Sequence, residues 1–266
     1  MQGNVVTALL LTTSAGLATG VGSAMALVGR RTSPRFLSAA LGFSAGVMIY
    51  LSFVEVLPES RAFLETDFGP ERGSWLSLAA FFGGMLVIAL LDRILPSFEN
   101  PHEARTVEEM DVLPDKQHLL RMGLFTAMCI ALHNFPEGAA TFISGMHNTR
   151  LGVSIAIAIA LHNIPEGIAV AVPIYYATGS RRKAFWLSFL SGVAEPVAGL
   201  ITFLVVRVTS AGSLLGVLFG AVAGIMVFLS LDELLPTARQ YGRGHLAIYG
   251  TIVGMVVMAI SLVCFR

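Results

Sequence analysis

HNFPEG at 133–138 and HNIPEG at 162–167 lie inside strongly apolar segments of this 266-residue chain. Each copy places a His and a Glu four residues apart, a spacing that puts both side chains on one face of an α-helix. Two such helices facing each other would bring together two imidazoles and two carboxylates. The pair therefore predicts a site for a divalent transition metal, placed where lipid should exclude charge.

The composition around these motifs is that of a membrane protein. The chain is 55% hydrophobic and 13% charged, whereas soluble domains carry about 25% charged residues. Eight apolar stretches are each long enough to cross the roughly 30 Å hydrocarbon core of a bilayer. They cover about 4–29, 35–58, 74–95, 119–145, 150–177, 183–206, 212–236 and 245–265. We therefore expect an all-α fold with eight transmembrane helices embedded in a lipid bilayer.

The positive charges are divided unevenly between the two sides of this arrangement. With the N-terminus outside, the inner loops hold 12 Lys and Arg residues and the outer side holds 5. Inner loops of membrane proteins carry the excess of positive charge. This favours a multi-pass protein of the plasma (inner) membrane, with both termini in the periplasm or extracellular space and the polar loop at about 96–118 in the cytoplasm. The net charge is zero, and nothing indicates nucleic-acid binding.

A second internal repeat relates the two ends of the chain. GFSAGVMIYLSFVEVLP at 42–58 and GAVAGIMVFLSLDELLP at 220–236 are identical at nine of 17 positions. Five spans separate the copies, an odd number, so they run in opposite directions across the membrane. We interpret residues 1–266 as one transmembrane domain, with inverted repeats at about 4–95 and 183–265 around central helices at about 119–177. Inverted repeats with polar, Pro-interrupted helices at their junction are typical of transporters.

The central motifs hold further polar groups. Asn134 and Asn163 follow the two histidines and are rotated from them by about 100° on a helix. Pro136 and Pro165 cannot donate a backbone hydrogen bond, so each leaves a carbonyl of the preceding turn available to another partner. A path for metal ions could use all of these features: the imidazoles, carboxylates and amide oxygens as ligands, and a broken helix for its free carbonyl groups.

Glu195, in SGVAEPVAGL, is a third carboxylate within an apolar stretch. A charged group at the bilayer centre costs about 2.5–3.5 kcal/mol on insertion scales. One divalent cation would balance Glu137 and Glu166, and a second cation or a proton would balance Glu195. The alternatives are helix–helix hydrogen bonds, which Asn or Gln would make without that cost, and a metal-free proton relay, which does not explain the paired histidines.

The doubled HNxPEG, the GVAEP that follows it and GFSAGVM…EVLP in the second span resemble the ZIP family (Zrt-, Irt-like proteins) of divalent-metal transporters, and most closely its bacterial branch. The resemblance covers essentially the whole chain. It implies a 3+2+3 arrangement of helices, transport toward the cytoplasm and a homodimer.

The resemblance also implies a binuclear metal centre in which two glutamates bridge the metals. The first site maps onto His133, Glu137, His162 and Glu166. The second site maps onto Asn134, Glu137, Asn163, Glu166 and Glu195. Met48 matches a position that lines the transport site in relatives. The imidazole-rich first site suits Zn²⁺ and Fe²⁺.

Two acidic residues at equivalent repeat positions, Glu55 and Glu233, are weaker candidates for the transport path, because helix ends commonly carry charges. The predicted cargo is zinc, with iron, manganese, cobalt and cadmium as further divalent cations, and no prosthetic group is expected. The competing functions are an intramembrane metalloenzyme such as a hydrolase, since adjacent metals can activate water, and a metal-selective channel. The sequence has no HExxH motif, and the inverted repeat favours a carrier.

Overall fold

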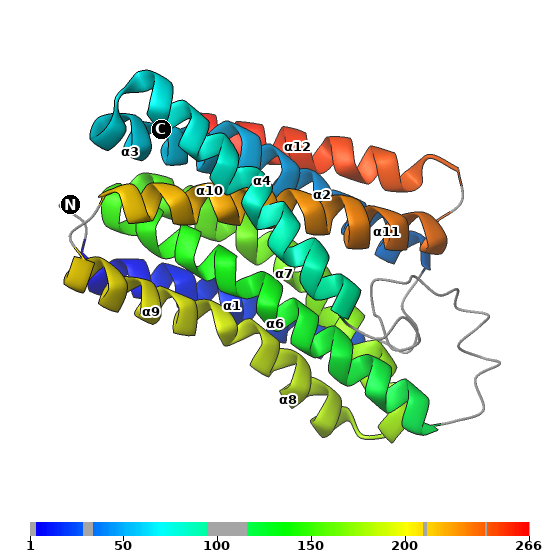
Figure 1. Ribbon diagram of the computed structural model, residues 1–266. Helices are drawn as coiled ribbons and strands as arrows, with labels where there is room; N and C mark the ends of the chain where they lie inside the picture. Colours follow the sequence, from blue (N-terminus) through cyan, green and yellow to red (C-terminus); the bar gives the residue numbers. More distant parts are fainter. Residues whose placement is uncertain (1–3, 29–33, 95–115, 210–211, 243, 266) are drawn as a thin grey trace.

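The computed structural model describes residues 4–28, 34–94, 116–209, 212–242 and 244–265, and every regular element in these ranges is helical (Figure 1). Two elements are π-helical turns, named η1 and η2. In chain order the elements are α1 (Val5–Val28), α2 (Pro34–Leu51), η1 (Ser52–Val56), α3 (Leu57–Phe68), α4 (Pro70–Ile94), α6 (Lys116–His147), α7 (Thr149–Thr178), α8 (Arg181–Gly192), α9 (Ala194–Thr209), α10 (Gly212–Leu229), η2 (Ser230–Leu234), α11 (Leu235–Tyr241) and α12 (Leu246–Phe265).

The helices agree with a protein that crosses a membrane many times. Within the described ranges, seven helical segments are long and apolar enough to span a bilayer. They overlap seven of the eight predicted stretches, and the second span continues to Phe68, ten residues beyond the predicted end at 58. The remaining stretch, 119–145, lies in α6, a continuous helix of 32 residues that carries more polar groups. The all-α membrane class is confirmed, and the count of eight spans stays a prediction.

Both termini lie at the same end of the long helices, which we name the terminus side (Figure 1). The turn between α6 and α7 is also on this side. Asn148 caps α7 there by accepting hydrogen bonds from the backbone N–H of Arg150 at 2.9 Å and of Leu151 at 3.4 Å. A capping Asn satisfies N–H groups that have no partner within the helix. The polar turn therefore reverses the chain, so that α6 and α7 run antiparallel.

The helices form two bundles. The site bundle contains α1, α6, α7, α8 and α9, and the companion bundle contains α2, α3, α4, α10, α11 and α12. In Figure 1 the companion bundle lies above, and α7 lies between it and the rest of the site bundle. The bundles meet where α7 contacts α2 and α12, and where α6 contacts α10. The largest hydrophobic core draws residues from both.

Close backbone contacts occur inside each bundle and depend on glycine. A methyl group at Gly167 of α7 would overlap the carbonyl of Thr19 in α1. In the companion bundle, a methyl group at Gly46 of α2 would overlap the carbonyl of Thr251 in α12. Small residues let helices approach closely in a membrane, where burial of apolar surface does not drive helices together. Each bundle is thus tightly packed within itself.

The interruptions of the long helices fall at positions that differ from those expected. α6 continues through Pro136 and α7 through Pro165, so the predicted breaks in the central helices are absent from the described backbone. The chain is instead interrupted at Val193, between α8 and α9. It also widens at η1 and η2, where the N–H of the following residue donates to the carbonyl five residues earlier.

The two π turns occupy equivalent positions of the repeated sequence, each directly before a Leu-Pro pair. In each copy the Ser at the start of the turn donates to a Met carbonyl one turn earlier, Ser52 to Met48 and Ser230 to Met226, both at 2.7 Å. A proline cannot close the regular hydrogen bond to its preceding turn, and a π turn shifts the ladder by one residue there. The repeated sequence therefore produces the same local distortion twice.

Candidate metal centre

Six of the predicted ligands are buried side chains of three neighbouring helices. Asn134 and Glu137 come from α6, His162, Asn163 and Glu166 from α7, and Glu195 from the first turn of α9. At most 1% of the surface of each residue is exposed. The side chain of His133 lies outside the described residues, so its role as a ligand stays a prediction.

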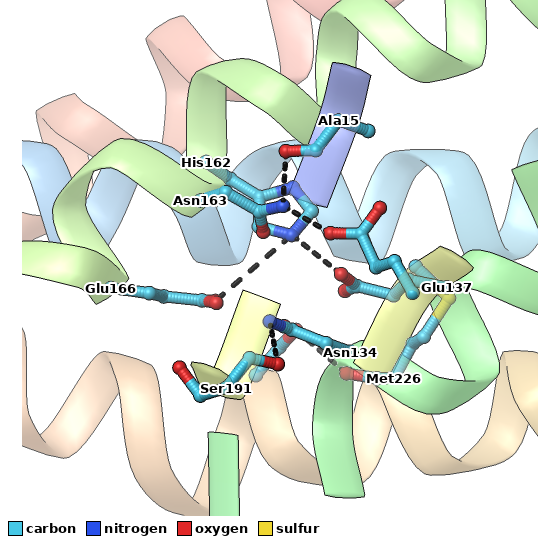
Figure 2. A network of polar contacts seen from close by, with 10 residues as sticks. Ala15, Asn134, Glu137, His162, Asn163, Glu166, Ser191 and Met226 are labelled. Carbon is cyan, nitrogen blue, oxygen red and sulfur yellow. Dashed lines mark hydrogen bonds and ion pairs between the residues drawn. The ribbon is translucent and has the colours of Figure 1, made fainter. Parts of the chain in front are cut away.

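His162 lies between two carboxylates (Figure 2). Its Nε2 is 2.9 Å from Oε2 of Glu137 on α6 and 4.0 Å from Oε1 of Glu166 one turn further along α7. Burying carboxylates is costly unless a positive charge or hydrogen bonds compensate for the lost water. The predicted convergence of the two motifs is thus present for one imidazole and both carboxylates, and the cluster favours a cation.

Asn163 is oriented by two acceptors. Its Nδ2 donates to the carbonyl of Ala15 at 2.9 Å and, over a short distance, to Oε1 of Glu195. These two bonds use both hydrogens of the amide, and the reverse orientation would set Oδ1 against two other oxygens. Oδ1 accepts no hydrogen bond. The contact with α1 therefore leaves the amide oxygen of Asn163 available to a cation.

Asn134 follows the same pattern on α6. Its Nδ2 donates to the carbonyl of Ser191 at 3.2 Å, and its Oδ1 accepts no hydrogen bond. Ser191 is near the end of α8, one turn before Glu195. α6 lies close to this part of the chain, since a methyl group at Gly138 would overlap the backbone of Glu195. Each amide is held through its nitrogen by a backbone carbonyl of a helix outside the α6–α7 pair.

Sequence reasoning missed the two orienting carbonyls of Ala15 and Ser191, because a backbone carbonyl has no signature in the sequence. It also passed over Met226 of α10, which is fully buried and is drawn with the network in Figure 2. The signal for it was present, because Met226 is the repeat mate of Met48. Met48 is likewise fully buried, one turn before η1.

The other two candidates lie in the π turns of the companion bundle. Glu55 is buried within η1, and Glu233 is half-buried within η2. The structure places them at equivalent points of the two repeat copies. Their place in the transport path stays a prediction.

The cluster has direct contacts between ligands. Among the residues that the structure describes, no three His, Cys, Asp or Glu side chains surround a common point closely enough to hold a metal ion without further groups. At His162, the ring Nε2 lies 2.9 Å from Oε2 of Glu137. These groups have the chemistry of metal ligands and lie close together, and a cation bound by both His162 and Glu137 would replace their direct hydrogen bond.

Asn163→Asp tests the orientation of the amide. The change removes both N–H donors and sets a second carboxylate against Glu195, so we expect a loss of stability of about 3–5 kcal/mol, the range seen when a buried charge loses its partner. Thermal unfolding in detergent measures this loss. Adding Glu195→Gln should restore part of it, because the new amide can donate to Asp. A double variant no more stable than Asn163→Asp alone would contradict the assigned hydrogen bond.

The many apolar helices define a multi-pass membrane protein. It contains a buried site of imidazole, carboxylate and amide groups, and polar groups within membrane helices usually mark the path of an ion or substrate. The chain matches the ZIP zinc transporter family over residues 93–262. It is 55% identical to a zinc transporter ZupT of Streptococcus mutans over 265 residues, covering 100% of both chains. It is 56% identical to proteins of the same name from Lysinibacillus sphaericus and Nitratidesulfovibrio vulgaris, covering 99% of each chain in both cases.

This chain belongs to the ZIP zinc transporter family. The predicted resemblance is confirmed over the full length of the chain. The family consists of transporters, so the intramembrane metalloenzyme considered from the sequence is wrong.

Proposed function

We propose that this protein is a carrier that imports Zn²⁺ into the cytoplasm through the polar cluster of α6, α7 and α9. The observation that carries the proposal is the position of His162 between Glu137 and Glu166 in a fully buried site. Imidazole and carboxylate together suit zinc. Iron, manganese, cobalt and cadmium, which such ligands also accept, are proposed as further cargo.

Two metals would share the cluster. The first would be bound by His133, Glu137, His162 and Glu166. The second would be bound by Asn134, Glu137, Asn163, Glu166 and Glu195. The unpaired amide oxygens of Asn134 and Asn163 support the second set, and Glu137 and Glu166 would bridge the two ions. Met48 would line the path beside them.

Transport would proceed by alternating access. The bundles are tightly packed internally, and their mutual contact is limited to a few helices. The site lies in one bundle, so movement of that bundle as a body would carry the bound metal relative to the companion bundle. The almost complete burial of the six described ligands also disfavours an open channel in this conformation.

The orientation that we propose places the terminus side outside the inner membrane. It rests on the 12 positive residues assigned to the inner loops against 5 outside. Eight spans in a 3+2+3 arrangement, inverted repeats and a homodimer complete the proposal. The matching π turns η1 and η2 support the repeats.

Uptake by purified protein in liposomes tests this function. With a zinc-sensitive dye inside, we expect saturable zinc uptake that Fe²⁺, Mn²⁺, Co²⁺ and Cd²⁺ inhibit to different degrees and Mg²⁺ does not, because imidazole favours transition metals. Liposomes without protein give the background. If the folded protein gives no more zinc uptake than the protein-free liposomes, the proposal is wrong. Uptake that rises linearly with zinc concentration would favour a channel.

A further inference from the structure

We propose that Ser154 and Ser261, together with His147 and Phe63, form a clasp that closes the site on the terminus side and must open in every transport cycle. This rests on the proposed carrier function. The clasp identifies the residues at which the two bundles would separate. Neither the family membership nor the ligand cluster specifies these residues.

The first part of the clasp is a hydrogen bond between the bundles. Oγ of Ser154 lies 2.8 Å from Oγ of Ser261. Ser154 is in the first two turns of α7, in the site bundle, and Ser261 is near the end of α12, in the companion bundle. Both positions are on the terminus side, and the pair is largely buried. In an apolar surrounding, separating the two hydroxyls leaves each without a partner unless water enters.

The second part is a contact between aromatic rings at the same end. His147, the last residue of α6, meets Phe63 of α3 edge to face, with ring centroids 6.4 Å apart. Phe63 in turn stacks on Phe219 of α10 at 6.0 Å. The site bundle thus rests through His147 on an aromatic pair of the companion bundle. His147 is exposed, and even pairs of Phe, Tyr or Trp contribute only about 0.5–1.5 kcal/mol beyond burial, so such a contact can form and break within a cycle.

The position of the clasp connects it to the access of metal ions to the ligand cluster. His162 lies about two turns from Ser154 along α7 and about 80° around its axis. A separation of α7 from α12 at the serines would therefore expose α7 on a side next to its ligand-bearing face. The six described ligands are almost fully buried, so a metal can reach them only after helices around the site separate. A carrier must open one side at a time. We assign the terminus-side opening to this clasp.

The two hydroxyls suit a cross-linking test. Oxygens 2.8 Å apart bring their Cβ atoms within reach of the roughly 3.5–4.5 Å that a disulfide requires. The variant Ser154→Cys/Ser261→Cys is made with the two native cysteines removed as Cys129→Ala and Cys264→Ser. Zinc uptake into liposomes is measured after oxidation and again after reduction, and peptide mapping gives the cross-linked fraction.

The chain offers a matched control inside one bundle. Oγ of Ser60 in α3 lies 2.9 Å from Oγ of Ser77 in α4, and both helices belong to the companion bundle. The variant Ser60→Cys/Ser77→Cys therefore forms the same kind of bond without joining the bundles. It is oxidised, reduced and assayed in the same way.

We expect oxidation to lower zinc uptake by about tenfold or more in the Ser154/Ser261 variant, because one conformation becomes locked, and reduction to restore it. The control should transport equally in both states. Full uptake by the cross-linked Ser154/Ser261 variant would overturn the clasp, and so would an equal loss in the control or a failure of the two cysteines to join. The reduced protein tests the carrier function separately: if it takes up zinc, the carrier function holds even where the clasp is wrong.

Discussion

Replacing Glu137 or Glu166 by Gln should abolish zinc transport. Gln keeps the shape and the hydrogen-bonding capacity of the side chain, so the contact of Glu137 with His162 can persist. The change removes the negative charge that would hold the cation at a fully buried position. We expect zinc affinity to fall by more than about 100-fold, since even groups that only support a metal ligand cost 10–100-fold when altered. Zinc titration of purified protein and uptake into liposomes measure the effect.

Glu71→Gln is the control for this pair of variants. Glu71 is exposed in the first turn of α4, at the end of the companion bundle, and its loss changes the net charge by the same amount. Uptake should stay at the level of the unmodified protein. If Glu137→Gln and Glu166→Gln also bind and carry zinc normally while remaining in the membrane, the cluster is not the transport site.

Gly167→Ala should damage the site without altering any predicted ligand. The new methyl group would overlap the carbonyl of Thr19, so α1 has to move away from α7. Overpacking of this kind costs about 1–3 kcal/mol. Because α1 supplies the Ala15 carbonyl that orients Asn163, we also expect zinc affinity to fall. Thermal unfolding in detergent and zinc titration measure the two effects separately.

Gly83→Ala is the matched control on α4. Nothing lies within 4 Å of a methyl group placed there, and alanine favours a helix over glycine by about 1 kcal/mol. Stability should stay the same or rise, with zinc affinity unchanged. Equal behaviour of the two variants would mean that the α1–α7 contact does not hold the site together.

The sequence predicted the helical segments well because the bilayer imposes a length and an apolar composition on each of them. The i, i+4 spacing also predicted correctly that His162 shares a face with Glu166, a property of helix geometry alone. The proline argument failed for the central helices. Pro136 and Pro165 each lack the N–H of one backbone hydrogen bond, yet α6 and α7 run through them as continuous helices.

The identity and spacing of the polar groups within the apolar segments can be predicted from the chain alone, since both follow from local chemistry and helical periodicity. How these groups are oriented, and which helices they join, depends on the three-dimensional packing. The carbonyls of Ala15 and Ser191 fix the two amides from helices distant in the chain. The contact of Ser154 with Ser261 joins two bundles across 107 positions of sequence. Such contacts depend on how helices pack in three dimensions, which glycine positions permit but do not specify.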